Sequence, residues 1–123
     1  DLIEWLDRVR PPWNVNVAAQ VAGIAALQER RYLEESHRVV EEGRRFLTEQ
    51  LTKLGLKVVP SVANFLMVRV GRGASFRAAL LQHGICVRDC ASFGLPAYVR
   101  IGVRTLPECR KLVQAVQQVL QGD

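Results

Sequence analysis

The first third of the chain carries two apolar segments with a proline turn between them. Amphipathic spacing over residues 2–10 predicts a short helix. Pro11-Pro12-Trp13-Asn14 interrupts this helix, and Asn14 or Asn16 can cap the next one. Residues 15–27 are small and apolar nearly all round. A helix of this kind is buried on several sides, so we expect it to need more cover than a small sheet offers.

A long amphipathic helix is predicted over residues 31–54, ending at Gly55. Its apolar residues at seven-residue spacing are Leu33, Val40, Leu47 and Leu54. Ser36 and Gly43 share this face and allow another backbone to come close. The opposite face alternates acidic and basic residues at i,i+4 spacing. This alternation indicates a solvated surface and argues against a nucleic-acid partner.

After Gly55 the hydrophobic period changes to two, which indicates strands. The predicted elements are a strand over 57–59, an inner strand over 65–70, a helix over 74–83, strands over 85–88 and 98–103, and a final helix that begins with the capping box Thr105-x-x-Glu108. The apolar stripe of the final helix is Cys109, Leu112, Val113, Val116, Val119 and Leu120. The fold class is therefore α+β, an α/β sandwich. Long helices precede a β-β-α-β-β-α unit whose small, mostly antiparallel sheet is covered by helices on one face.

Strict alternation sorts the side chains of the strand over 98–103. Its valines and isoleucine are expected to face the helices, which leaves Arg100, Gly102 and Arg104 on the free face. In the strand before it, Cys86 and Arg88 share that side. Arg88, Arg100 and Arg104 would then converge beside the loop over 92–96. Two interpretations stay open: a solvated sheet face with arginines stacked on neighbours, or a face that binds carboxylate or phosphate.

Composition and charge narrow the class of protein. The chain has 123 residues, 49% of them apolar, which is enough for one domain or a piece of a larger one. No apolar run approaches the roughly 20 residues of a membrane span, and no signal peptide is recognisable. The formal charge is +5, and of the 17 basic residues only Lys53, Lys57 and Lys111 are lysine. The chain begins without Met inside an amphipathic pattern, as expected of an excised segment.

Other candidate residues carry less chemistry. Cys86, Cys90 and Cys109 form no C-x-x-C pair, so we expect free thiols in a reducing, cytoplasmic compartment, with Cys90 buried. His37 and His83 are expected to pack or to cap a helix. We find no metal-ligand cluster and no catalytic constellation in the pattern of residues. The sequence therefore predicts arginines that could bind part of a substrate, without the catalytic groups of a complete active site.

Three stretches together resemble a known family. They are 9–16 (VRPPWNVN) with the Ala-rich helix after it, Ala63-Asn64-Phe65, and above all the block 84–101 (GICVRDCASFGLPAYVRI). They are similar to the C-terminal part of the fold-type-I pyridoxal-phosphate (PLP) enzymes, in the branch of the histidinol-phosphate aminotransferases and threonine-phosphate decarboxylases. The resemblance covers essentially the whole chain. It implies that residues 1–30 end the large domain and that residues 31–123 form the small C-terminal domain with the long interdomain helix 31–54.

The resemblance also implies roles for individual residues. Arg100 matches the arginine that binds the substrate carboxylate, and Arg88 matches an arginine near the anionic end of phosphorylated substrates. The Schiff-base lysine and the rest of the PLP site belong to the large domain, and none of the three lysines matches that position. We therefore expect PLP in the full-length parent, no cofactor and no activity on this chain alone, and a homodimeric parent enzyme.

The substrate is a finer question. Threonine phosphate carries a carboxylate and a phosphate, which suits Arg88, Arg100 and Arg104 together, so the sequence favours a threonine-phosphate decarboxylase of cobalamin biosynthesis. The alternative is a histidinol-phosphate aminotransferase of histidine biosynthesis. An alternative of another class is a free-standing anion-binding or regulatory module, which would bind small anions in a salt-sensitive way.

Overall fold

The structure is a computed structural model that describes residues 1–122. The chain divides into two compact units, one over Asp1–Glu35 and one from Ser36 onward. The division lies inside one continuous helix, α3 (Arg30–Lys53), which begins in the first unit and continues in the second.

The first unit contains two short helices before α3. α1 (Leu2–Val9) begins with a capping box in which the Asp1 side chain accepts from the Ile3 amide and Glu4 reaches back. α2 (Val17–Gln28) is capped by Asn16, whose Oδ1 accepts from the Ala19 amide at 2.8 Å. Both helices therefore form where the sequence predicts them.

The expected burial of the second helix is not found in this chain. No residue of α1 or α2 is buried, and apolar side chains such as Val21 and Ile24 are more than half exposed. The physical reason is that the unit contains only helical segments and no second layer that could cover an all-apolar helix.

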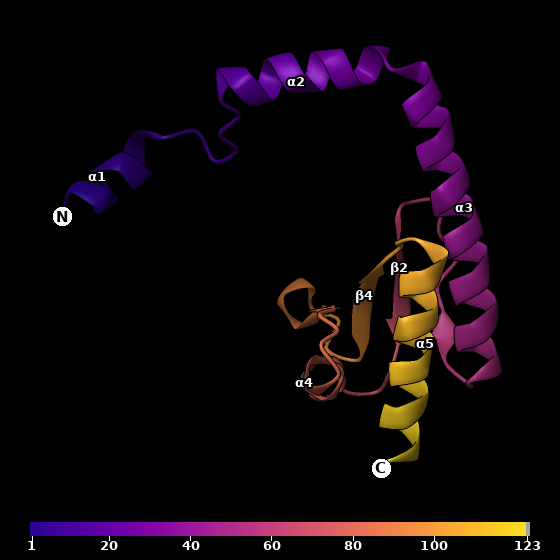
Figure 1. The fold of residues 1–123 in the computed structure, drawn as a ribbon. Helices are drawn as coiled ribbons and strands as arrows, with labels where there is room; N and C mark the ends of the chain where they lie inside the picture. The colour runs from indigo at the N-terminus through magenta and orange to yellow at the C-terminus, as the bar shows by residue number, and fades with distance from the viewer. Residues whose placement is uncertain (123) are drawn as a thin grey trace. The chain divides into compact units, whose positions relative to one another are not determined.

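The second unit is a four-stranded sheet with three helices (Figure 1). Its strands are β1 (Lys57–Val58), β2 (Phe65–Arg69), β3 (Arg88–Asp89) and β4 (Tyr98–Gly102), and its later helices are α4 (Gly73–Gln82) and α5 (Leu106–Gln121). The spatial order is β1-β2-β4-β3, and every neighbouring pair is antiparallel. The predicted α+β fold and the predicted inner position of β2 are confirmed.

The core lies between one face of this sheet and the helices. Burial alternates along β2 and β4, so that Leu66, Val68, Val99 and Ile101 face inward. The helices contribute Leu47 and Leu51 of α3, Phe76 and Leu80 of α4, and Leu112, Val113 and Val116 of α5. The predicted stripe of α5 is wrong at Leu120, which is 40% exposed in the last turn. On the opposite face of the sheet, Phe65, Arg69, Arg100 and Gly102 are exposed.

The third predicted strand is much shorter than expected. β3 contains Arg88 and Asp89, whereas residues 85–87 have no regular structure. The Ile85 amide donates to the Leu80 carbonyl oxygen, which closes the end of α4 after the left-handed Gly84 (φ 72°). The backbone at Ile85 is therefore committed to the helix end and begins to pair with β4 only at Arg88.

Candidate functional site

Arg88 and Arg100 lie directly opposite each other on the open face of the sheet. Arg88 of β3 is the register partner of Arg100 of β4, and Met67 of β2 is the partner of Arg100 on its other side. Both arginines are exposed. This confirms that the two side chains share one face, as the alternation predicts. Like charges directly opposite each other destabilise a sheet, so this pair is a local cost to the fold.

Each guanidinium lies over a different aromatic ring. The Arg100 guanidinium carbon is 5.2 Å from the centre of the Phe65 ring, and that of Arg88 is 5.7 Å from the centre of the Phe93 ring. Arg88 Nη2 also donates to Ser92 Oγ at 2.9 Å. Stacking on a ring holds a guanidinium in place, and it leaves the N–H groups at its edge available to an anion.

The loop before β2 is held in place from α3. Arg44 Nη1 donates to the carbonyl oxygens of Val62 and Ala63 at 3.0 and 3.3 Å. The next carbonyl, of Asn64, accepts from the Val103 amide at 2.8 Å. These bonds fix the start of β2 and with it the Phe65 ring on which Arg100 stacks.

A shallow depression of about 550 Å³ joins these residues. It is lined by Asn64, Phe65, Arg77, Cys86, Val87, Arg88, Arg100 and Gly102. Three of these residues are arginines and none is a carboxylate. A Cβ on Gly102 would meet nothing within 4 Å, so the space beside Arg100 is open, as the sequence predicts for this glycine.

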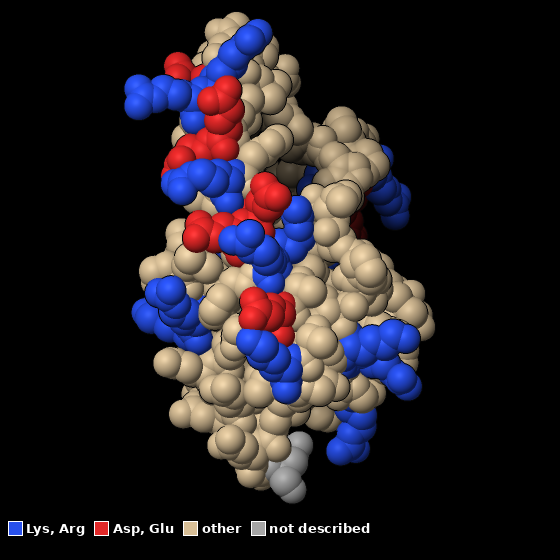
Figure 2. Space-filling model, turned by 90° about the vertical axis from the view of Figure 1, so that its right-hand side faces the viewer, with Lys and Arg blue, Asp and Glu red and all other residues tan. Residues whose placement is uncertain are grey.

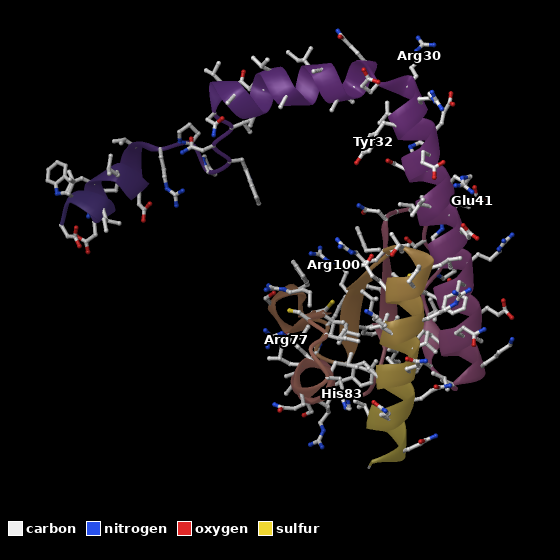
Figure 3. The ribbon with its side chains drawn as sticks, in the orientation of Figure 1. Arg30, Tyr32, Glu41, Arg77, His83 and Arg100 are labelled. Carbon is white, nitrogen blue, oxygen red and sulfur yellow. The ribbon has the colours of Figure 1, made fainter. Side chains whose placement is uncertain are left out.

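Arg77 is the functional candidate that the sequence reading missed. It projects from α4, whereas Arg100 projects from β4, and Figure 3 labels both. The apolar spacing of α4 accounts for Phe76 and Leu80 but gives no signal for the arginine between them. Arg77 lines the depression only because α4 packs beside the sheet in the folded chain.

Arg104 lies elsewhere, contrary to the expected convergence of three arginines. It follows the end of β4 and does not line the depression. Its Nε and Nη2 donate to Glu108 Oε1 at 3.1 and 3.0 Å, while Thr105 Oγ1 donates to Glu108 Oε2. The Thr105 hydroxyl, followed by Arg104, holds the pKa of Glu108 below its ordinary value. Arg104 is therefore part of the cap of α5.

The remaining candidates are the three cysteines and the two histidines. Cys90 is buried, as expected, and Cys109 is buried with its Sγ donating to the Arg104 carbonyl oxygen at 3.3 Å. Burial raises the pKa of the Cys109 thiol. Cys86 is exposed and lines the depression. His37 is exposed on α3, and His83 caps the end of α4. Within residues 1–122 no three potential ligands gather into a metal site.

The charged surface of α3 mixes both signs. Figure 2 looks onto the side of the molecule along which α3 runs, and basic and acidic side chains are interspersed there rather than separated by sign. Such a surface is a poor match for a nucleic-acid backbone, which attracts one sign of charge. No helix within residues 1–122 has the length and hydropathy needed to cross a bilayer.

The three lysines all lie outside the depression. Lys53 pairs with Glu49 on α3, Lys57 is exposed in β1, and Lys111 lies on α5. PLP enzymes hold their cofactor through a lysine that forms a Schiff base. The depression thus fits the binding of an anion, and its lining offers no lysine for the covalent attachment of PLP.

Comparison with known proteins identifies the family. The model for aminotransferase class I and II matches residues 1–116 of the chain. The chain belongs to the aminotransferase class I and II family. The histidinol-phosphate aminotransferase of Nitratidesulfovibrio vulgaris is 42% identical over 120 residues, which are 97% of this chain and 32% of that protein. A histidinol-phosphate aminotransferase of Nitrosococcus oceani is 42% identical over 122 residues, covering 98% of this chain and 33% of that protein.

Solved structures of the family share the fold. The histidinol-phosphate aminotransferase from Clostridium acetobutylicum is 29% identical with a TM-score of 0.79, covering 96% of this chain and 37% of that one. The enzyme from Sinorhizobium meliloti, solved in complex with pyridoxal-5'-phosphate, is 27% identical with a TM-score of 0.75, covering 97% of this chain and 34% of that one. The chain thus spans about one third of the length of the family members that it matches.

Proposed function

We propose that this chain is the C-terminal small domain of a PLP-dependent aminotransferase that acts on histidinol phosphate, with residues 1–30 as the junction to the large domain. The observation that carries the proposal is the opposed pair of Arg88 and Arg100 in a depression lined by no carboxylate. The pair costs stability unless an anion lies between its members. The similarity to histidinol-phosphate aminotransferases supplies the substrate class.

The two arginines have different tasks in this proposal. Arg100, on a rigid inner strand and stacked on Phe65, binds a carboxylate of the oxo or amino acid that exchanges the amino group. Arg88, held by Ser92 and Phe93, binds at the phosphate end of the substrate. PLP, bound by the large domain of the same protein, supplies the electron sink for the reaction. This chain's part is to hold the substrate in a reactive orientation.

The threonine-phosphate decarboxylase, which the sequence favours, is supported less well than its alternative, the histidinol-phosphate aminotransferase. The prediction of a decarboxylase relied on Arg104 as a third arginine for threonine phosphate, and Arg104 is paired with Glu108. The named relatives from N. vulgaris and N. oceani are histidinol-phosphate aminotransferases. These two observations favour the aminotransferase. Decarboxylase activity is one of the outcomes that the experiment below distinguishes.

The exposed apolar surface of α2 fits a domain junction in a homodimeric parent. Its side chains are exposed on every side of the helix in this chain, including Val17, Val21, Ile24 and Leu27. An all-apolar helix is stable in water only when other parts of the protein cover it. The large domain and a second subunit would provide that cover.

A chimaeric enzyme tests the proposed function. This chain replaces the 120 matching residues of the N. vulgaris enzyme, and formation of the oxo acid's amino product from histidinol phosphate is measured. We expect activity, and Arg100→Ala should raise KM for the carboxylate-bearing substrate on the order of 100-fold, because about 3 kcal/mol of charge-assisted binding is lost. Arg110→Ala, an exposed arginine of α5, is the matched control.

Three outcomes would contradict the proposal. A chimaera that releases CO2 from O-phosphothreonine without aminotransferase activity would identify a decarboxylase. A folded, PLP-loaded chimaera with no activity on either substrate would leave the free-standing anion-binding module. An unchanged KM in Arg100→Ala would remove Arg100 from the site.

A further inference from the structure

Arg77 brings a third positive charge to the depression from a separate element. It lies on α4, one turn after Gly73, and lines the same depression as Arg88 and Arg100. α4 is held close to the sheet at its start: the Gly73 amide donates to the Pro96 carbonyl oxygen at 2.8 Å, and a Cβ on Gly73 would come within 2.6 Å of the Tyr98 carbonyl oxygen. The position of Arg77 relative to β4 is therefore fixed by close backbone packing.

Arg77 has no partner of its own within the described chain. It makes no ion pair, hydrogen bond or ring contact with residues 1–122, whereas Arg88 and Arg100 each stack on a ring. The residue as a whole is half-buried, and it follows the buried Phe76 in α4. None of its guanidinium nitrogens is buried, so its N–H donors are solvated and are available to a ligand.

We propose that Arg77 is a specificity-determining residue that completes a three-arginine site for a phosphate monoester dianion. Two observations carry this proposal: three arginines, from β3, β4 and α4, line one depression, and no carboxylate residue lines it. The identification of the phosphate with that of the substrate rests on the proposed function. Binding of phosphate by the chain itself does not rest on it.

The charge of the site favours phosphate over a carboxylate. One guanidinium fork satisfies both oxygens of a carboxylate, so a second and a third arginine would be left unpaired. A phosphate monoester has three peripheral oxygens and a charge of about −1.5 to −2 at pH 7, which can accept from several arginines at once. The two substrates of an aminotransferase bind in successive half-reactions. Arg100 would therefore donate to the carboxylate of the oxo acid in one half-reaction and, with Arg88, to the phosphate in the other. Arg77 provides the additional donor that a carboxylate does not need.

The first test uses this chain as it is, titrated with inorganic phosphate and, separately, with acetate while backbone and arginine side-chain NMR signals are followed. We expect saturable phosphate binding that Arg77→Gln weakens about 10-fold, the loss of one charge-assisted hydrogen-bonding group. Arg77→Lys keeps the positive charge but lacks the two-pronged guanidinium. Its affinity for phosphate should lie between that of the parent chain and that of Arg77→Gln. Arg110→Gln removes one charge from α5, outside the depression, and should bind phosphate as the parent chain does. Acetate binding should be the same in all four proteins.

The second test uses the chimaera. Arg77→Gln should raise KM for histidinol phosphate about 10-fold and leave KM for the oxo acid within about two-fold. Equal phosphate affinity in Arg77→Gln and Arg110→Gln would overturn the assignment, and so would a parent chain that binds no phosphate. Phosphate binding that depends on Arg77 in a chain whose chimaera has no aminotransferase activity would sustain the three-arginine site and reject the proposed function.

Discussion

Gly43 of α3 lies against the main chain of Arg104. A Cβ on Gly43 would come within 2.8 Å of the Arg104 carbonyl oxygen and within 2.8 Å of Val103 Cγ1. The first of these atoms belongs to the backbone between β4 and α5, which cannot move without shifting the helix cap. The absence of a side chain at residue 43 is thus what allows α3 to pack against the end of the sheet.

We expect Gly43→Ala to destabilise the second unit by about 1–3 kcal/mol, because overpacking outweighs the gain of up to about 1 kcal/mol in helix propensity. Urea unfolding followed by circular dichroism measures the change. Gly23→Ala in α2 is the control, since a Cβ there meets nothing within 4 Å and the same propensity gain applies. A Gly43→Ala protein as stable as Gly23→Ala would show that the close approach is absent in solution.

Gly102→Ala should separate binding from stability. The methyl group would meet no protein atom within 4 Å, and φ at residue 102 is not positive, so the free energy of unfolding should change by less than about 0.5 kcal/mol. The same methyl group would occupy the depression beside Arg100 and should weaken phosphate binding. Titration with inorganic phosphate checks this. Unchanged affinity would place the anion away from Gly102.

Periodicity predicted the parts of the fold that depend on local pattern. The alternation of residues 98–103 placed Val99 and Ile101 in the core and Arg100 outside, and the seven-residue spacing in α3 found the buried Leu47. These succeed because one buried face leaves a repeating mark in the sequence.

The failures depend on relations between elements. Ile85 pairs with the end of α4 instead of a strand, Arg104 turns to Glu108 of its own cap, and Arg77 enters the depression from a helix. Each is set by how one element meets another, and a linear pattern does not record that. The family resemblance assigns roles only to residues in matched motifs. It therefore predicts Arg88 and Arg100 as site residues and gives no signal for Arg77, which lies outside those motifs.

The cap of α5 should make stability depend on pH. The pKa of Glu108 lies below its ordinary value of 4.5, chiefly because Thr105 donates to the carboxylate and then because Arg104 does. A group with a lowered folded pKa stabilises the fold above its unfolded pKa, and this is lost as pH falls through the folded value. Glu108→Gln should therefore unfold at a lower urea concentration than the parent at about pH 6, with the gap narrowing towards about pH 3. A gap independent of pH would show that the carboxylate charge is not involved.

The three thiols should differ sharply in reactivity. Cys90 and Cys109 are buried, and burial raises the pKa of the Cys109 thiol, so both should resist a thiol reagent in the folded chain. Cys86 is exposed on the wall of the depression and should react. A disulfide exchange reagent added to the native chain should thus release one equivalent, against three in denaturant. Cys86→Ser should abolish the one equivalent that the native chain releases rapidly. In the parent chain, saturating inorganic phosphate should slow the release of this equivalent, because the bound anion shares the depression with Cys86. A fast equivalent that persists in Cys86→Ser would mean that a core thiol opens to solvent, and a rate indifferent to phosphate would place the anion outside the depression.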